Sequence, residues 1–152
     1  LLAGLNNPIE WIHFGDGPYR LKVEEEIQKL PSNIKAELRG NIDNSEIIAF
    51  YRNNHVDAFL SLSLSEGIPV SMMEAQSFSI PLIAYPVGGI PEIIKNRETG
   101  ILLSSSDSIP EQTADLNNAL NFDFSRSDIQ SFFELNFSAL INYSAFIDEL
   151  KA

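Results

Sequence analysis

Short apolar runs alternate with longer amphipathic stretches along most of this chain. The runs have the length and composition of buried strands, and the stretches carry apolar residues at helical spacing. The expected strands are 9–14, 34–38, 58–62, 81–84 and 101–103; helices are expected at 18–30, from residue 44 or 45 onward, and at 70–78 and 91–95. Because parallel strands need crossover connections, this order predicts a doubly wound, Rossmann-like α/β domain with a mostly parallel sheet of about five strands.

The chain beyond the predicted sheet is expected to be helical. After a Ser-rich loop at 104–108, Ser108 with Glu111 and Ser125 with Asp128 have the spacing of capping boxes. One long last helix is predicted to pack on this domain or on a domain outside the chain. The apolar residues on one face of that helix are Ile129, Phe133, Leu140, Ile147 and Leu150. The expected division is therefore 1–124, the α/β domain, and 125–152, the C-terminal helix.

Composition and charge limit the possible partners. With 152 residues and 44% hydrophobic content, the chain can bury one compact core. Ten basic against 21 acidic residues give a net charge of −11, which repels nucleic acid and anionic lipid. The chain has no cysteine, as in reducing compartments, and no apolar run of membrane-spanning length, so we expect a cytoplasmic domain without direct membrane insertion. It starts at Leu1 without an initiator Met, so an excised domain with an upstream partner is expected.

The first candidate ligand loop is the turn Gly15-Asp16-Gly17 after the first strand. Open α/β sheets bind ligands at the carboxyl ends of their strands, and glycine lets the backbone approach a ligand closely. A plain tight turn explains these two glycines equally well. Because the third glycine of the dinucleotide fingerprint is absent, and no suitably placed acidic residue ends a following strand, a nicotinamide cofactor is disfavoured.

The segment after the third strand carries two carboxylates around a predicted helix start. Glu66 lies in the loop, Gly67 permits close backbone approach, and Pro69 begins a helix whose second turn carries Glu74. The free N–H groups around 68–71 and the helix dipole suit a phosphate. Carboxylates beside a diphosphate are repelled unless they accept hydrogen bonds from hydroxyl groups, so the pattern points to a nucleoside diphosphate sugar. The alternative is that both glutamates are ordinary surface acids.

A second glycine-rich loop favours the ligand site over surface acids. Gly88-Gly89 follows the strand at 81–84 and precedes a helix that begins at Pro91, so this loop lies at the same edge of the sheet. Neither His13 nor His55 has a second ligand at metal spacing, so no metal site is expected.

These motifs together resemble the donor-binding domain of the group 1 retaining glycosyltransferases, the C-terminal half of a GT-B fold. Glu66 and Glu74 match the family's pair of glutamates separated by seven residues, and the resemblance extends over about Ile12 to Leu103. The other matching segments are 14–18, 39–42, 81–84, 88–92 and 99–102. Capsular and surface-polysaccharide enzymes resemble the chain most, which implies polysaccharide or glycoconjugate biosynthesis.

The resemblance implies a role for each site residue. Glu66 would be the catalytic carboxylate near the reacting carbon of the donor sugar, and Glu74 would hold the ribose hydroxyls. Backbone groups of Gly67, Ile68, Pro69 and Val70 would meet sugar and phosphate, Asn41 and Ile42 the base, and Gly15, Gly17, Gly88 and Gly89 would shape the donor cleft. The substrate would be a UDP- or GDP-linked sugar, transferred with retention to an acceptor hydroxyl, without cofactor or metal.

The chain departs from the family pattern in two ways. Ser79 stands where glycine is usual, and nothing in 1–8 supplies the Arg and Lys that neutralise the diphosphate in the family. Arg20, Lys22 and Arg39 are either substitutes for these cations or surface residues. The chain alone is therefore expected to be inactive without an N-terminal acceptor-binding domain. Two rival hypotheses stay open: a sugar-nucleotide epimerase of the same architecture, and a non-catalytic sugar-nucleotide-binding module.

Overall fold

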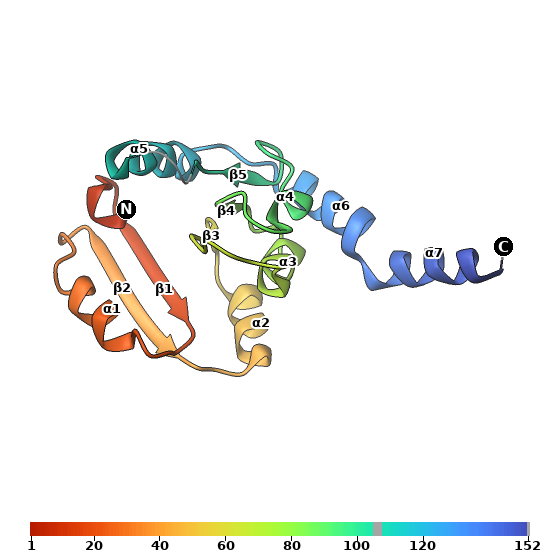
Figure 1. Ribbon diagram of the computed structural model, residues 1–152, viewed down its shortest axis with the longest axis horizontal. Coiled ribbons are helices and arrows are strands. Elements are labelled where there is room, and N and C mark those ends of the chain that lie inside the picture. The colour runs from red at the N-terminus through yellow and green to blue at the C-terminus, as the bar shows by residue number, and fades with distance from the viewer. Residues whose placement is uncertain (105–107, 152) are drawn as a thin grey trace.

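The computed structural model describes residues 1–104 and 108–151 as alternating strands and helices (Figure 1). The strands are β1 (Ile9–Phe14), β2 (Ile34–Gly40), β3 (Phe59–Ser61), β4 (Leu82–Ala84) and β5 (Gly100–Leu102). The helices are a 3-10 turn η1 (Leu2–Gly4), α1 (Arg20–Ile27), α2 (Asn44–Asn53), α3 (Val70–Ser77), α4 (Ile90–Ile93), α5 (Ile109–Leu120), α6 (Arg126–Phe137) and α7 (Ala139–Lys151). The predicted strands and crossover helices are all present, with ends shifted by a few residues.

All paired strands are parallel, which confirms the expected α/β class, but they form two sheets in the described part of the chain. β1 pairs with β2, and β3-β4-β5 form a separate sheet in that order. The predicted sheet of about five strands is thus divided between β1 and β3. Each strand is marked by its own apolar run, whereas the pairing of one run with another is not visible in the sequence.

The core consists of two apolar clusters on opposite faces of the β3-β4-β5 sheet. Leu82 and Ala84 belong to one cluster with residues of α2, α3 and α4, and Ile83 belongs to the other with residues of α5. All three β4 side chains are fully buried. Because successive side chains of a strand point to opposite faces, this alternation shows that helices cover both faces of β4.

The C-terminal region differs from the single long helix that was predicted. The helix is interrupted at Ser138, whose backbone is extended, and continues as α7. In α6, Ile129 is fully buried and the helix packs on α3, whereas Ile147 and Leu150 in α7 are 47% and 72% exposed. Figure 1 shows α7 extending away from the rest of the molecule. The five apolar residues therefore do not form one buried face; the side chain of Leu140 lies outside the described residues.

A half-buried arginine and a serine with a left-handed backbone hold α6 in place. The Arg126 guanidinium donates to the carbonyl oxygens of Ser79, Val56 and Asp57 at 2.9, 2.9 and 3.3 Å. Ser79 has a φ of 59°, the region that favours glycine, the residue that the resemblance implies at this position. Its hydroxyl bonds to Gln130 of α6 at 3.0 Å, so serine adds a contact that glycine lacks.

Local signals at the other helix ends are confirmed to different degrees. Ser108 and Glu111 form the complete capping box predicted for α5. Ser125 caps α6 by accepting a hydrogen bond from the Asp128 N–H. Residues 105–107 of the expected Ser-rich loop lie outside the described residues. No described helix has both the length and the apolar character that crossing a membrane requires.

Candidate functional site

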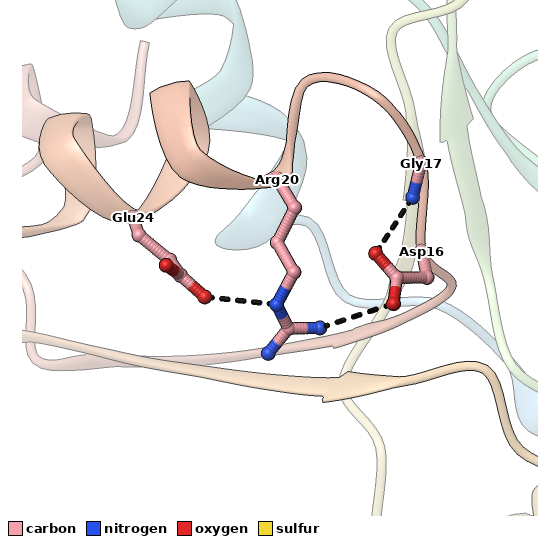
Figure 2. Close-up of polar contacts among 4 residues, drawn as sticks. All are labelled: Asp16, Gly17, Arg20 and Glu24. Atoms are coloured by element: carbon pink, nitrogen blue, oxygen red, sulfur yellow. Dashed lines mark hydrogen bonds and ion pairs between the residues drawn. The ribbon is translucent and has the colours of Figure 1, made fainter.

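The turn after β1 is fixed by its own side chains and by β2. Gly15 has a φ of +136° and donates its N–H to the Gly40 carbonyl at 2.7 Å. Asp16 accepts the Gly17 N–H at 2.7 Å and lies 3.7 Å from the Arg20 guanidinium, which also donates to Glu24 at 2.8 Å (Figure 2). The two glycines thus differ. The backbone conformation at position 15 requires a glycine, whereas position 17 has room for a side chain, because a Cβ there would have no atom within 4 Å.

The two arginines considered as phosphate ligands already have partners. Arg20 is shared between Asp16 and Glu24. Arg39 donates to both oxygens of Glu37 at 3.0 and 3.1 Å, an interaction that raises its pKa. Its guanidinium also lies 4.9 Å from the ring centre of Phe50. Both cations therefore stabilise the surface around the β1 and β2 ends in this structure.

The Glu66 loop leads into a helix with an uncapped start. α3 begins at Val70 after Pro69, whose φ of −74° and ψ of 115° are extended, and no side chain caps it. The N–H groups of Met72 and Met73 both turn toward the Pro69 carbonyl, at 3.2 and 3.4 Å. The first N–H groups of a helix have no partner within it, so the α3 start offers donors and a positive dipole end. Ile68 and Val70 are 49% and 61% exposed beside it.

Glu74 is oriented by a residue that sequence reasoning did not include in the site. The Asn44 side-chain amide, at the start of α2, donates to Glu74 Oε1 at 2.8 Å. Burial, and then the negative charge of Glu74, raise the pKa of Tyr51 to about 12, so this neighbouring hydroxyl stays protonated. The sequence indicated Asn44 or Ser45 only as the start of a helix, whose N-cap in the structure is Asp43, because nothing local shows the contact of Asn44 with a residue in another helix.

The two predicted ligand loops are in direct contact. The Gly89 N–H donates to the Gly67 carbonyl at 2.9 Å. Gly88 has a φ of +54°, and a Cβ there would lie 1.8 Å from the Glu66 carbonyl oxygen. A Cβ at Gly89 would lie 2.4 Å from the Ile68 side chain. These glycines therefore allow the loop after β4 to pack closely against the backbone that carries Glu66.

A cavity of about 430 Å³ brings together three of the predicted site residues, Glu66, Pro69 and Glu74. Its walls also include parts of β1, β3 and α2. The other predicted site residues are not among its lining residues: Gly15, Gly17, Asn41, Ile42, Gly67, Ile68, Val70, Gly88 and Gly89. In the described part of the chain neither Glu66 nor Glu74 takes part in an ion pair, so both carboxylates are available to accept hydrogen bonds from a ligand.

Metal ligation has no support in the geometry of residues 1–104 and 108–151, where no three acidic or histidine side chains cluster suitably. The His13 ring lies 5.7 Å from that of Trp11, and His55 is an exposed neighbour of Asp57 at 3.3 Å. Both histidines line the cavity.

Comparison with known proteins points to one family. Residues 1–130 match the family described as glycosyl transferases group 1. The chain is 33% identical over 96 residues to the sulfoquinovosyl transferase SQD2 of Arabidopsis thaliana. That alignment covers 61% of this chain and 18% of the relative, so the chain spans less than a fifth of that protein's length.

Solved structures show the same fold at low identity. The lipopolysaccharide outer core galactosyltransferase WaaB superposes with a TM-score of 0.77 at 22% identity, over 91% of this chain and 39% of that one. Anabaena HepE in complex with UDP and glucose gives a TM-score of 0.75 at 18% identity, over 99% of this chain and 42% of that one. The expected Rossmann-like half of a GT-B fold is thereby confirmed as a fold.

Proposed function

Because the chain belongs to the glycosyl transferases group 1 family, we propose that it is the donor-binding part of a glycosyltransferase and that it takes a nucleoside diphosphate sugar. One observation carries this proposal: Glu66 and Glu74 line the same cavity beside the uncapped start of α3. In a sugar nucleotide, the hydroxyls of the sugar and those of the ribose lie on opposite sides of the phosphates. This arrangement matches a group of N–H donors with one carboxylate acceptor on each side.

The ribose is assigned to Glu74. An ionised carboxylate has about four acceptor positions on its two oxygens, and Asn44 occupies one of them on Oε1. The remaining positions can accept two neighbouring hydroxyls, and the amide of Asn44 fixes the carboxylate orientation before the ligand arrives. The diphosphate is assigned to the α3 start, around Val70 and Ser71, because negative charge is favoured there.

The donor sugar is assigned to Glu66. In the proposed reaction the anomeric carbon loses its bond to a diphosphate oxygen and forms a bond to the oxygen of an acceptor hydroxyl, with retention of configuration. The proton of that hydroxyl passes to the leaving diphosphate. Positive charge then develops on the sugar and negative charge on the leaving diphosphate. The Glu66 carboxylate stabilises the positive charge on the sugar, and the dipole and N–H groups of the α3 start stabilise the negative charge on the diphosphate.

The donor and the acceptor class remain predictions. HepE has been solved with UDP and glucose, which supports UDP over GDP as the first ligand to test. SQD2 and WaaB are, by their names, transferases of different sugars, so membership of the family does not determine the sugar. We keep the polysaccharide role, the cytoplasmic location and the need for an acceptor-binding domain as parts of the proposal.

Calorimetric titration with UDP tests the assignment in the longer polypeptide that carries this domain. We expect Glu74→Ala to weaken UDP binding at least about tenfold, or about 1.4 kcal/mol, because the ribose loses its acceptors. Glu25→Ala, at an exposed position of α1, is the matched control and should leave the affinity unchanged. Equal affinities for Glu74→Ala and the native protein would refute the ribose assignment.

Product analysis separates the transferase from its rivals. Incubation with a UDP-sugar and no acceptor should leave the sugar nucleotide unrearranged. Release of an epimerised sugar nucleotide would establish the epimerase instead, and binding without transfer to any acceptor would establish a binding module.

A further inference from the structure

Tyr51, in the last turn of α2, carries a buried polar group that has no part in the proposed reaction. Its side chain is only 9% exposed and belongs to the apolar cluster formed with α3 and α4. The ring packs against those of Phe50 and Phe78, whose centres lie 6.2 and 5.8 Å away. These apolar contacts fix the ring, and with it the position of the hydroxyl.

The Tyr51 hydroxyl has no hydrogen-bond partner among residues 1–104 and 108–151, although buried tyrosine hydroxyls usually have one. The buried Tyr85 shows the usual case, because its hydroxyl donates to Gln112 at 2.6 Å. In this described part of the chain, only Gln76 Oε1 is both unpaired and fully enclosed, so the Tyr51 oxygen keeps access to the cavity that Tyr51 lines. A ligand in that cavity can therefore satisfy this hydroxyl.

Asn44 and Tyr51 both have Glu74 as a neighbour. They are seven residues apart, about two turns of α2, so they lie on the same face of that helix. The Asn44 amide donates to Glu74 Oε1 at 2.8 Å. Burial, and then the negative charge of Glu74, raise the pKa of Tyr51 to about 12, so its hydroxyl keeps its proton at neutral pH. The cavity thus presents a neutral donor together with a carboxylate acceptor.

A ribose has a use for both groups. The Glu74 carboxylate only accepts hydrogen bonds, so a ribose hydroxyl bound to it donates its proton and keeps free lone pairs on its oxygen. The Tyr51 hydroxyl can donate to such an oxygen. A nucleotide that lacks this hydroxyl would leave a buried donor unpaired, and sites built in this way discriminate strongly against the analogue without the hydroxyl.

We propose that the Tyr51 hydroxyl donates a hydrogen bond to the oxygen of one ribose hydroxyl, while that same hydroxyl donates to Glu74. Tyr51 is then a specificity-determining residue, which makes the site favour a ribonucleotide over its deoxy analogue. This inference rests on the proposed function, because it takes Glu74 as the group that holds the ribose.

Calorimetric titration of the longer polypeptide with UDP, 2′-deoxy-UDP and 3′-deoxy-UDP tests this contact. We expect Tyr51→Phe, which keeps the ring and its apolar contacts, to weaken UDP binding about 2- to 10-fold, the scale of one neutral hydrogen bond. With one of the two deoxy analogues, the native protein and Tyr51→Phe should bind equally, because the hydroxyl that Tyr51 contacts is gone. With the other analogue the difference between the two proteins should persist.

Tyr85→Phe is the matched control. It also removes one buried tyrosine hydroxyl, but Tyr85 is not among the residues that line the cavity. Its UDP affinity should equal that of the native protein, which shows that loss of a buried hydroxyl elsewhere in the core does not weaken binding.

Two results would overturn the inference. Equal UDP affinities of the native protein and Tyr51→Phe would show that the hydroxyl does not contact the nucleotide. An effect of Tyr51→Phe that is the same for both deoxy analogues would show that Tyr51 acts on packing or on Glu74, and not on one ribose hydroxyl. If Glu74→Ala weakens UDP binding and Tyr51→Phe does not, this inference fails while the proposed function stands; if Glu74→Ala has no effect, the ribose assignment itself fails.

Discussion

The substitution Gly88→Ala tests how the Glu66 loop is held. Gly88 has a φ of +54°, and a Cβ there would lie 1.8 Å from the Glu66 carbonyl oxygen. Real Cβ contacts begin near 3.0 Å, so the two loops would have to separate by about 1.2 Å. That separation would stretch the hydrogen bond between the Gly89 N–H and the Gly67 carbonyl, which is 2.9 Å long.

The expected loss combines two terms. A left-handed backbone costs a residue with a Cβ about 1–2 kcal/mol, and an overpacked contact costs about 1–3 kcal/mol. We therefore expect Gly88→Ala to lower the free energy of unfolding by about 2–5 kcal/mol, measured by urea denaturation at constant m. A misplacement of about 1 Å at a reacting group can cost about 100-fold, so kcat/KM for the donor should fall on that scale.

Gly17→Ala is the matched control for stability. A Cβ at Gly17 meets no atom within 4 Å, so the free energy of unfolding should change by no more than about 0.5 kcal/mol. If Gly88→Ala keeps native stability and native donor turnover, the close packing of the two loops does not position Glu66, and that account of the site is wrong.

Three further predictions concern the contacts around this site. Arg126→Ala should lower the free energy of unfolding by about 2–4 kcal/mol in urea, because carbonyl oxygens lose charged donors, whereas the exposed Arg52→Ala should have little effect. Asn44→Ala should weaken UDP binding by about 2- to 10-fold in calorimetry, since Glu74 loses its orienting amide; unchanged binding would refute that role. Stability should fall as pH rises from about 10 to about 12, because the pKa of Tyr51 is raised to about 12 from an ordinary value of 10.0 and the unfolded chain loses this proton first. Tyr51→Phe should flatten the decline between those pH values in thermal unfolding, and an equal decline in both proteins would contradict the assignment.

Local patterns in the sequence predicted the strands and helices well, because each of them has its own pattern of buried apolar residues. β4 is apolar at every position since it is covered on both faces, and α5 begins at a complete capping box. The chain has no glycine or proline at the break between α6 and α7, so no residue there predicts a helix end. Helical spacing continues across Ser138, so the sequence could not show that its backbone is extended.

Long-range contacts were beyond the sequence for a different reason. Asn44 and Glu74 are 30 residues apart, and each is explained locally, the first as the start of one helix and the second as a residue within another. Gly88 was expected to approach a ligand, whereas the structure shows that it approaches the Glu66 backbone. The residue types at the site were therefore predictable, but the contacts that orient them depend on how separate elements pack.

The charges around the cavity limit how the site can bind a diphosphate. Glu66 and Glu74 line the cavity and take part in no ion pair among the described residues, while Arg20 and Arg39 are each held by carboxylates of their own. Within the described chain, the α3 start is thus the main group that can offset a bound diphosphate.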